Sequence, residues 1–310
     1  MVALSPLGGC SRKPPPHAEC AATTAPSRLE TPTPGLENVW QLSDKLYCGG
    51  SPAGDAGFRT LALLGVKSIV SVDGARPNVI MAQRYGLQYL HAPVTYDGIS
   101  RDKVLYLAKA LQELPGPIYL HCHHGKHRGP AAAVAAMMCI RPELMPEQAV
   151  ELMQQIGTDP HYRGLYSVPT SLVRPTSEEL KAVQLILSHT SEVTPLAESM
   201  VRIDLHWDRL ASWKEAGWKQ PAGHPAMVPH HEALLLFEQL YELGRVYSHH
   251  PSDFLQMARE ARDAVSELEH VLSERSTNAN TELLDERFQR VEQSCNKCHE
   301  LYRDNPSHTK

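Results

Sequence analysis

The chain has 310 residues, of which 42% are hydrophobic and 21% charged, and its formal net charge is −5. This composition is ordinary for a globular protein, and the negative balance excludes a general binder of nucleic acids or other polyanions. No run of about 18 apolar residues predicts a membrane-spanning helix. At about 150 residues per domain, the length predicts two domains. The cysteines, 7 in number, are too few for a disulfide-built scaffold.

Residues 1–37 are rich in proline and have almost no periodic apolar pattern, which predicts an extended tether. Within them, Leu7-Gly8-Gly9-Cys10 resembles the lipobox of bacterial lipoproteins, and this resemblance implies export and a lipid anchor at Cys10. The segment before Cys10 departs from the lipoprotein pattern, because it carries no Lys or Arg and its apolar stretch is short. The alternative is a tail with an idle thiol.

Strand-like and helix-like segments alternate from Val39 to about Ser188. We expect strands at 67–72, 87–92 and 117–121, helices at about 54–64, 77–85, 100–113 and 131–138, and a last helix from the capping box Thr176–Glu179 to about Leu187. This alternation predicts an α/β domain over residues 38–188, with a mostly parallel central sheet flanked by helices.

The chemistry of this domain is expected where the third predicted strand ends. There, Cys122 opens a tight segment that closes on Arg128 and leads into an alanine-rich helix; we call residues 122–128 the cysteine loop. Successive N–H groups of such a loop form a nest for anions, and the following helix adds the positive end of its dipole. A cysteine there is expected to react as a thiolate, while an arginine holds two phosphate oxygens in a fork. This chemistry needs no metal.

His121-Cys122 and Arg128 together resemble the His-Cys-x5-Arg signature of the protein tyrosine phosphatase superfamily, and the dual-specificity group fits best. The resemblance covers about residues 38–188, and residues 38–52 look like that group's first strands. It implies that Cys122 is the nucleophile of a phosphocysteine mechanism. The stretch 125–128 is similar to atypical phosphatases of plants and fungi that act on inositol pyrophosphates, and Lys126 has a counterpart in phosphoinositide phosphatases. The expected substrate is therefore a phosphorylated protein, a phosphoinositide or an inositol phosphate.

The sequence departs from the superfamily at two places. Gly129 stands where most members have Ser or Thr, whose hydroxyl helps to expel the thiolate, so hydrolysis of the phosphocysteine is expected to be slow. The superfamily's general acid is an aspartate on a separate upstream loop, and we assign it to Asp97, which precedes Gly98. Asp73, at the end of the first buried strand, is the rival. Either aspartate could instead cap a turn.

The remaining polar residues of the cysteine loop offer further hydrogen-bond donors. One interpretation is that they bind phosphate groups in a wide basic pocket; these residues are His123, His124, Gly125, Lys126 and His127. The other is that several side chains point away, because loop side chains alternate in direction. A zinc site on the loop is not expected, since adjacent imidazoles lack the separated ligand pairs of zinc sites.

After a linker at 189–195, the pattern becomes helical only. Apolar residues at spacings of about three and four define one buried helix face through Leu196, Met200, Ile203, Trp207 and Leu210. Further helices are expected at 234–247, after Pro251, and over 284–302. Four helices with short connections predict an all-α four-helix bundle over residues 196–310.

Cys295-Asn-Lys-Cys298-His299 on the last predicted helix is the attachment sequence of c-type haem. The spacing presents both sulfurs to the haem vinyl groups and offers the His299 imidazole to the iron. Its place in a four-helix bundle resembles the cytochrome c-prime and cytochrome c-556 family. That resemblance implies one covalent haem c with His299 as proximal ligand and Met200 as distal ligand. The alternatives are a zinc or redox Cys-x-x-Cys and a Met200 that only fills the core.

The sequence therefore predicts a phosphatase fused to a haem c domain for redox or gas sensing or electron transfer. Because haem c is attached outside the cytoplasm, the predicted compartment is periplasmic or extracytoplasmic. The expected partners are a phosphorylated protein or small polyphosphate as substrate and a redox partner for the haem, with no nucleic acid. The alternative is a haem protein whose first domain only binds phosphate. Gly129 in place of Ser or Thr supports this alternative, whereas the presence of Cys122 and Arg128 argues against it.

We further predict that the state of the haem controls the phosphatase, with Cys48 as a candidate resolving thiol. The alternative is two activities joined by a tether without energetic coupling.

Overall fold

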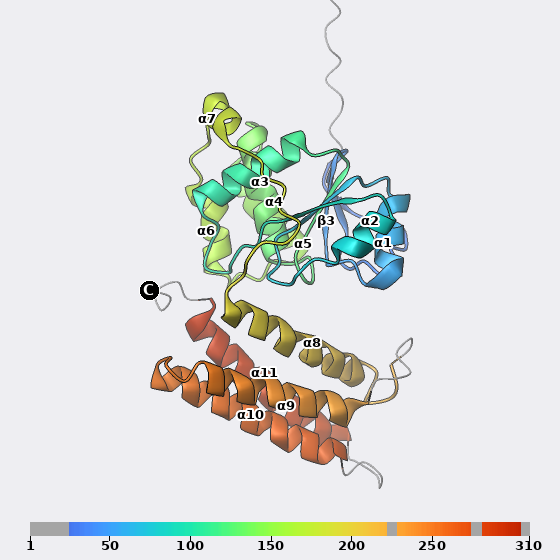
Figure 1. Ribbon diagram of the computed structural model, residues 1–310, viewed down its shortest axis with the longest axis vertical. Helices are drawn as coiled ribbons and strands as arrows, with labels where there is room; N and C mark the ends of the chain where they lie inside the picture. Colours follow the sequence, from blue (N-terminus) through green and yellow to red (C-terminus); the bar gives the residue numbers. More distant parts are fainter. Residues whose placement is uncertain (1–24, 222–227, 274–280, 305–310) are drawn as a thin grey trace, which may run out of the picture.

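The computed structural model describes residues 25–221, 228–273 and 281–304. They form an α/β domain and a helical bundle, and α8 lies between that domain and the rest of the bundle (Figure 1). The predicted lipid attachment at Cys10 lies outside the described residues. No helix within these ranges is long and apolar enough to cross a membrane.

The α/β domain is built on one mixed sheet in the order β1-β2-β3-β6-β4-β5. The strands are β1 (Ser27–Arg28), β2 (Trp40–Ser43), β3 (Leu46–Gly49), β4 (Ser68–Ser71), β5 (Gln88–His91) and β6 (Ile118–His121). The pairings from β3 to β5 are parallel, whereas β1 and β2 add an antiparallel edge. A mixed sheet with flanking helices is the expected α/β architecture, but the parallel part is limited to four strands.

Helices cover both faces of this sheet. Ile69 of β4 packs in the apolar cluster that contains α1 (Gly54–Leu63) and α2 (Val79–Arg84), while its neighbour Val70 points into the opposite cluster. That second face carries α3 (Arg101–Glu113), α4 (Arg128–Ile140), α5 (Pro146–Ile156), α6 (Arg163–Ser171) and α7 (Ser177–Ala182) (Figure 1). Six consecutive buried residues, 131–136, are alanines apart from Val134, so α4 lies close to its neighbours in the core.

The sheet brings the ends of three strands to one edge. Gly49 of β3 and Ser71 of β4 both stand in register with His121 of β6. The cysteine loop begins directly after β6, and Asp73 follows β4 by two residues. The parallel topology therefore places Asp73 beside the loop, as is common for ligand sites at the carboxyl ends of parallel strands.

Two boundaries of the sequence prediction are wrong. The capping box does open α7, but the helix ends at Ala182 rather than near Leu187. Val183 turns the chain into extended backbone, and the carbonyl of Ser188 accepts a 2.8 Å hydrogen bond from the N–H of His91, so this segment follows β5. The predicted tether of residues 1–37 is too long, because β1 pairs with β2 and Leu36 is buried in the domain core.

The second half of the described chain holds α8 (Pro195–Glu215), α9 (Pro229–Val246), α10 (Ser252–Ser273) and α11 (Thr281–Tyr302). They share one apolar cluster, with Leu210, Leu236, Val265 and Val291 in its interior. Consecutive helices pack against each other, which is the arrangement expected for an up-and-down bundle.

Candidate active site

The cysteine loop needs glycine at its centre. Gly125 has φ +70°, and a Cβ on it would lie 2.2 Å from the carbonyl carbon of Gly49 and 2.4 Å from the nitrogen of Gly50. No side chain fits at such distances, and only glycine adopts this φ without strain. The loop therefore lies directly on the backbone that follows β3.

Three hydrogen bonds from distant residues hold the loop from outside. The N–H of Ser51 donates to the carbonyl of His123 over 2.7 Å, the Asn38 side chain to that of Gly125 over 3.0 Å, and the Thr158 hydroxyl to that of Lys126 over 2.7 Å. Within the described ranges, the backbone N–H groups of residues 123–127 have no protein partner. With carbonyls held outward and N–H groups unpaired, the loop has the properties of an anion nest.

Cys122 and Arg128 lie at the two ends of this nest. Cys122 is only 3% exposed. The Nη2 atom of Arg128 lies 2.9 Å from a carboxylate oxygen of Asp73, and its guanidinium lies over the ring of Tyr96, 4.7 Å from the centroid. Its buried Nε has no hydrogen-bond partner among the described residues. A buried N–H without a partner is costly, and a bound phosphate oxygen would satisfy it.

Asp73 positions Arg128. Burial acts to raise the pKa of Asp73, but the charges of Arg128 and of the neighbouring histidines outweigh it and leave this pKa below its usual value. An aspartate that stays ionised is a partner for a guanidinium and a poor proton donor. Asp73, the rival general acid of the sequence analysis, is therefore an anchor for Arg128, the predicted phosphate-binding arginine.

Asp97 lies on an exposed loop, where it accepts a hydrogen bond from the hydroxyl of Thr95. It lines an open cleft of about 530 Å³ between this loop, α3 and α6, and neither Cys122 nor Arg128 lines that cleft. The loop packs against α6, because a Cβ on Gly164 would lie 2.4 Å from the carbonyl carbon of Asp97. Among the described residues, the Asp97 side chain makes no hydrogen bond or ion pair with the cysteine loop, although its neighbour Tyr96 contacts Arg128. Its role as general acid stays a prediction.

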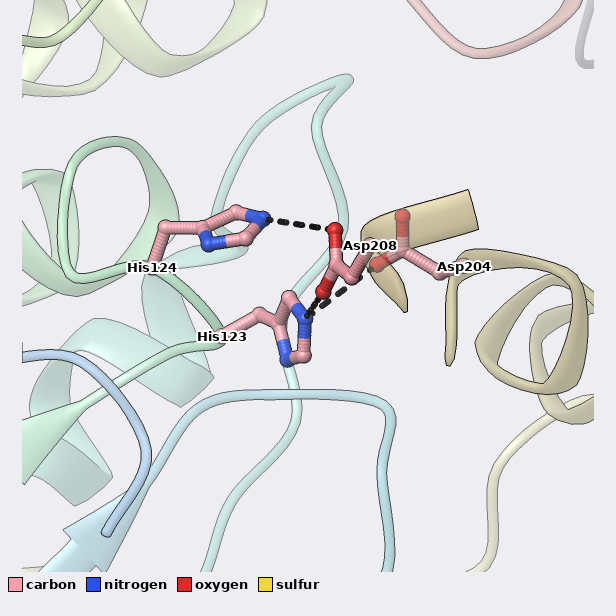
Figure 2. Close-up of side chains that lie close together, drawn as sticks. All are labelled: His123, His124, Asp204 and Asp208. Carbon is pink, nitrogen blue, oxygen red and sulfur yellow. Dashed lines mark hydrogen bonds and ion pairs between the residues drawn. The ribbon is translucent and has the colours of Figure 1, made fainter. Parts of the chain in front are cut away.

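The polar side chains of the loop do not form one basic pocket. His123 and His124 point toward Asp204 and Asp208 of α8 (Figure 2). The hydrogen bond from His123 to Asp208 raises the pKa of this imidazole to about 9.

The other two side chains of the loop have different surroundings. His127 packs against the rings of Tyr96 and Tyr162, and burial together with the nearby Arg303 lowers its pKa to about 4, so it is neutral at pH 7. Lys126 is exposed.

Gly129 faces Cys122, the predicted nucleophile. A Cβ at this position would lie 3.4 Å from the sulfur of Cys122 and 3.5 Å from that of Cys48. A Ser or Thr hydroxyl would thus stand beside the thiolate, and this chain lacks it. Cys48 is also the thiol that sequence analysis named as a resolving cysteine; burial and the neighbouring Cys122 raise its pKa far above the usual value.

The bundle also reaches the α/β domain through the end of α11. Arg303 donates to the hydroxyl of Tyr162 over 3.1 Å and lies 4.7 Å from the centroid of the Tyr96 ring. Tyr96 thus contacts both Arg303 and the phosphate-binding Arg128. Sequence reasoning missed these tyrosines and Arg303, because no local pattern links them.

The predicted haem residues lie on one side of α11. Cys295, Cys298 and His299 are half-buried, and Cys295 packs against the same bundle core as Met200 of α8. Burial lowers the pKa of His299 to about 3 and raises that of Cys295 to about 12. The imidazole is therefore neutral, which is the form that ligates iron.

No family model matches the chain. A curated protein, the dual specificity protein phosphatase TpbA of Pseudomonas aeruginosa, is 32% identical over 155 residues, which are 49% of this chain and 66% of that protein. The crystal structure of P. aeruginosa TpbA covers 49% of this chain and 97% of that chain, at 21% identity and a TM-score of 0.40. The core catalytic domain of the PP-IP phosphatase SIW14 from S. cerevisiae covers 47% and 89%, at 17% identity and a TM-score of 0.38.

About half of the chain is therefore similar to a dual specificity protein phosphatase, in agreement with the prediction from the cysteine motif. The match spans slightly less than two thirds of the length of the curated relative, and it leaves half of this chain outside it.

Proposed function

We propose that the chain is a cysteine-dependent phosphatase that hydrolyses phosphate monoesters and carries a haem c domain outside the cytoplasm. The observation that carries the first part is the cysteine loop, which combines a buried thiol, unpaired N–H groups and the unpartnered Nε of Arg128 within seven consecutive residues. These are the parts that phosphoryl transfer requires, since positioning and charge stabilisation supply most of its catalysis.

In the proposed reaction, the Cys122 thiolate attacks phosphorus and the bond to the ester oxygen breaks. Asp97, once its loop has moved, gives its proton to the leaving oxygen. Water then attacks the phosphocysteine, Asp97 takes a proton from this water, and phosphate leaves as the thiolate reforms. Throughout, Arg128 and the loop N–H groups bind the phosphate oxygens.

The substrate we favour is a phosphorylated protein, because the curated relative is named a dual specificity protein phosphatase. A small polyphosphate is the second candidate, since the exposed Lys126 offers a cation at the loop. An assay of the full chain with an aryl phosphate, a phosphotyrosyl peptide and an inositol polyphosphate ranks these classes by kcat/KM.

Replacement of the nucleophile tests the mechanism. Cys122→Ser is expected to lower turnover at least about 10³-fold while the chain still binds a phosphate analogue, because the nest and Arg128 remain. Cys139→Ser, a change at a free cysteine of α4, is the matched control and is expected to retain full activity. Activity of Cys122→Ser within tenfold of wild type would contradict the proposal.

The second part of the proposal is one covalent haem c on Cys295 and Cys298. The chain fits this group, because α11 presents two thiols and one neutral imidazole on one side of the bundle. A bound haem supplies one-electron redox chemistry or gas binding, tuned by its axial ligands. His299 would hold the iron, and Met200 would be the second ligand.

Protein made with haem-maturation machinery is expected to give a pyridine haemochrome spectrum of haem c and to keep its haem in acid–acetone. Haem that is fully extracted would contradict the covalent link. Met200→Ala is expected to convert a six-coordinate low-spin spectrum to a five-coordinate high-spin one, whereas an unchanged spectrum would leave Met200 as a core residue.

Export and a lipid anchor at Cys10 are part of the same proposal, since haem c attachment takes place outside the cytoplasm. In a bacterial host, the full chain is expected in the membrane fraction on the extracytoplasmic side, and Cys10→Ala in the soluble extracytoplasmic fraction. Recovery of both forms in the cytoplasm would contradict it.

One observation favours a second function. The empty side-chain position at Gly129 leaves the thiolate without a hydroxyl neighbour. In that reading, the first domain binds phosphate compounds for a haem protein and turns them over negligibly. The Cys122→Ser comparison separates the two, because a pure binding module shows no turnover to lose.

A further inference from the structure

Four side chains join the cysteine loop to the bundle, and Figure 2 shows them pointing toward one another. His123 and His124 come from the loop, and Asp204 and Asp208 lie one turn apart on the same face of α8. One ligand atom from each of the four lies within 4.8 Å of the others. These side chains are between 32% and 48% exposed, so an ion reaches them from solvent.

We propose that these four residues bind one divalent transition-metal ion, with zinc as the best match, and that this ion fastens α8 to the cysteine loop. Two imidazole nitrogens and two carboxylate oxygens are a tetrahedral zinc donor set, with bonds of about 2.0–2.2 Å. Imidazole donors disfavour calcium and magnesium, which take oxygen ligands. Modest closure of the cluster would bring the four donors to these distances.

A second observation points to a metal independently of the four donors. Each imidazole has another carboxylate at its opposite nitrogen. The Nε2 of His123 lies 2.7 Å from Asp208 and its Nδ1 lies 3.8 Å from Asp73. The Nε2 of His124 lies 3.7 Å from Asp208 and its Nδ1 lies 3.8 Å from Glu37. In metal-bound histidines an outer carboxylate accepts a hydrogen bond from the second ring nitrogen and fixes the tautomer and the orientation of the ring. Here the outer carboxylates stand 3.8 Å from these nitrogens, so a shift of about 1 Å would form the two hydrogen bonds.

The charges of the cluster also favour a cation. Arg128 balances Asp73 at 2.9 Å. In the described part of the chain, the ion pairs of Asp204 and Asp208 are made with the two histidines and with no lysine or arginine. One divalent ion would balance the two carboxylates, and on binding it would replace the proton that His123 shares with Asp208 in the metal-free chain. The sequence analysis excluded zinc for want of a second ligand pair, and α8 supplies that pair.

Zinc titration of the chelator-treated full chain by calorimetry tests the site. We expect one equivalent of zinc to bind, and Asp204→Asn with Asp208→Asn to weaken binding at least about 100-fold. Glu37→Gln, which leaves all four ligands intact, is expected to weaken it about tenfold or more. His230→Ala with His231→Ala removes an exposed adjacent pair on α9 and is the matched control, with unchanged affinity. Circular dichroism checks that each variant keeps the wild-type helix content.

Zinc could instead occupy Cys295, Cys298 and His299 in chains that carry no haem, and X-ray absorption separates the two sites. We expect only nitrogen and oxygen neighbours at about 2.0–2.2 Å, whereas sulfur at about 2.3 Å overturns the proposal. No binding by the wild-type chain, or equal affinity in wild type, the Asp204→Asn/Asp208→Asn variant and Glu37→Gln, overturns it as well. If the double variant does not fold, the Glu37→Gln result decides.

Discussion

The cysteine loop and the Cys-x-x-Cys-His segment of α11 are both short cysteine motifs, but they depend differently on the rest of the chain. The loop is shaped by residues far away in sequence, such as Asn38 and Thr158, and its arginine is held by Asp73. The α11 residues need only a helix, which brings positions 295, 298 and 299 to one side. The first site is nearly complete in the folded chain, whereas the proposed second site would still require a covalently attached haem.

The largest expected effect tests whether the loop site is completed by a moving residue. Asp97→Asn is expected to lower kcat by about 10²–10⁴ for alkyl phosphates, the usual contribution of a general acid. The loss should shrink for an aryl phosphate whose leaving group needs no proton. Steady-state kinetics on both substrates measures the difference. An equal loss on both would assign Asp97 to the structure of its loop.

Asp73→Asn sharpens the same comparison through stability. It leaves the Arg128 guanidinium buried without its carboxylate, so we expect the free energy of unfolding to fall by about 3 kcal/mol at pH 7. We also expect kcat to fall equally for substrates with good and with poor leaving groups. Because the pKa of Asp73 is lowered in the folded chain, its contribution is fully present above its ordinary pKa of about 3.9. That contribution is lost as the pH falls through the lower folded value.

Thermal unfolding of wild type and Asp73→Asn from pH 7 down to pH 3 follows this contribution. The difference between the two melting temperatures should begin to narrow below about pH 4, where the unfolded chain starts to bind a proton at Asp73. A difference that stays constant with pH would show that the variant acts through packing rather than charge.

The order of helices and strands was predictable because apolar periodicity and chain breaks are local signals. The end of α7 was not, because a capping box fixes where a helix starts, and the extended chain after Val183 depends on contacts with β5. The same limit applies to the site. Cys122 and Arg128 stand six residues apart, so a motif reveals them, whereas Asn38 lies 87 residues from its partner Gly125.

Asp204 and Asp208 show the limit most clearly. Their spacing on a predicted helix was readable, but nothing in it indicates that they face His123 and His124 across the two domains. The role of Asp73 was likewise not predictable. The sequence shows an acidic residue, and only the fold shows that its carboxylate pairs with Arg128.

A smaller effect is expected at Gly129. Gly129→Ser places a hydroxyl beside the Cys122 sulfur, and one hydrogen bond to a charged group corresponds to about a tenfold faster expulsion of the thiolate. Rapid-mixing kinetics should show a burst of alcohol release in wild type and a reduced burst in Gly129→Ser. Gly129→Ala adds the same Cβ without the hydroxyl and should keep the burst. Equal acceleration by both variants would mean that filling space is responsible.

The smallest expected effect concerns the contact through which the two regions meet. Arg303 follows His299 by one helical turn, and it shares the ring of Tyr96 with Arg128. Arg303→Met keeps the length of the side chain and removes its charge. A partly exposed cation–π contact contributes about 0.5–1 kcal/mol, so we expect KM to rise about two- to fivefold with kcat nearly unchanged.

The same variant tests the prediction that the state of the proposed haem controls the phosphatase activity. A coupled pair of sites differs in affinity between two states by a definite free energy, typically about 1–3 kcal/mol, so kcat/KM of wild type should differ between the ferric and ferrous forms. In Arg303→Met the ratio of the ferric to the ferrous kcat/KM should move toward one. Lys297→Met, on the same helix but paired with Glu260 of α10, is the control and should retain the wild-type ratio. Equal kcat/KM in the ferric and ferrous wild type would instead mean that the two sites are not energetically coupled. A contact that both haem states make equally well shifts no equilibrium.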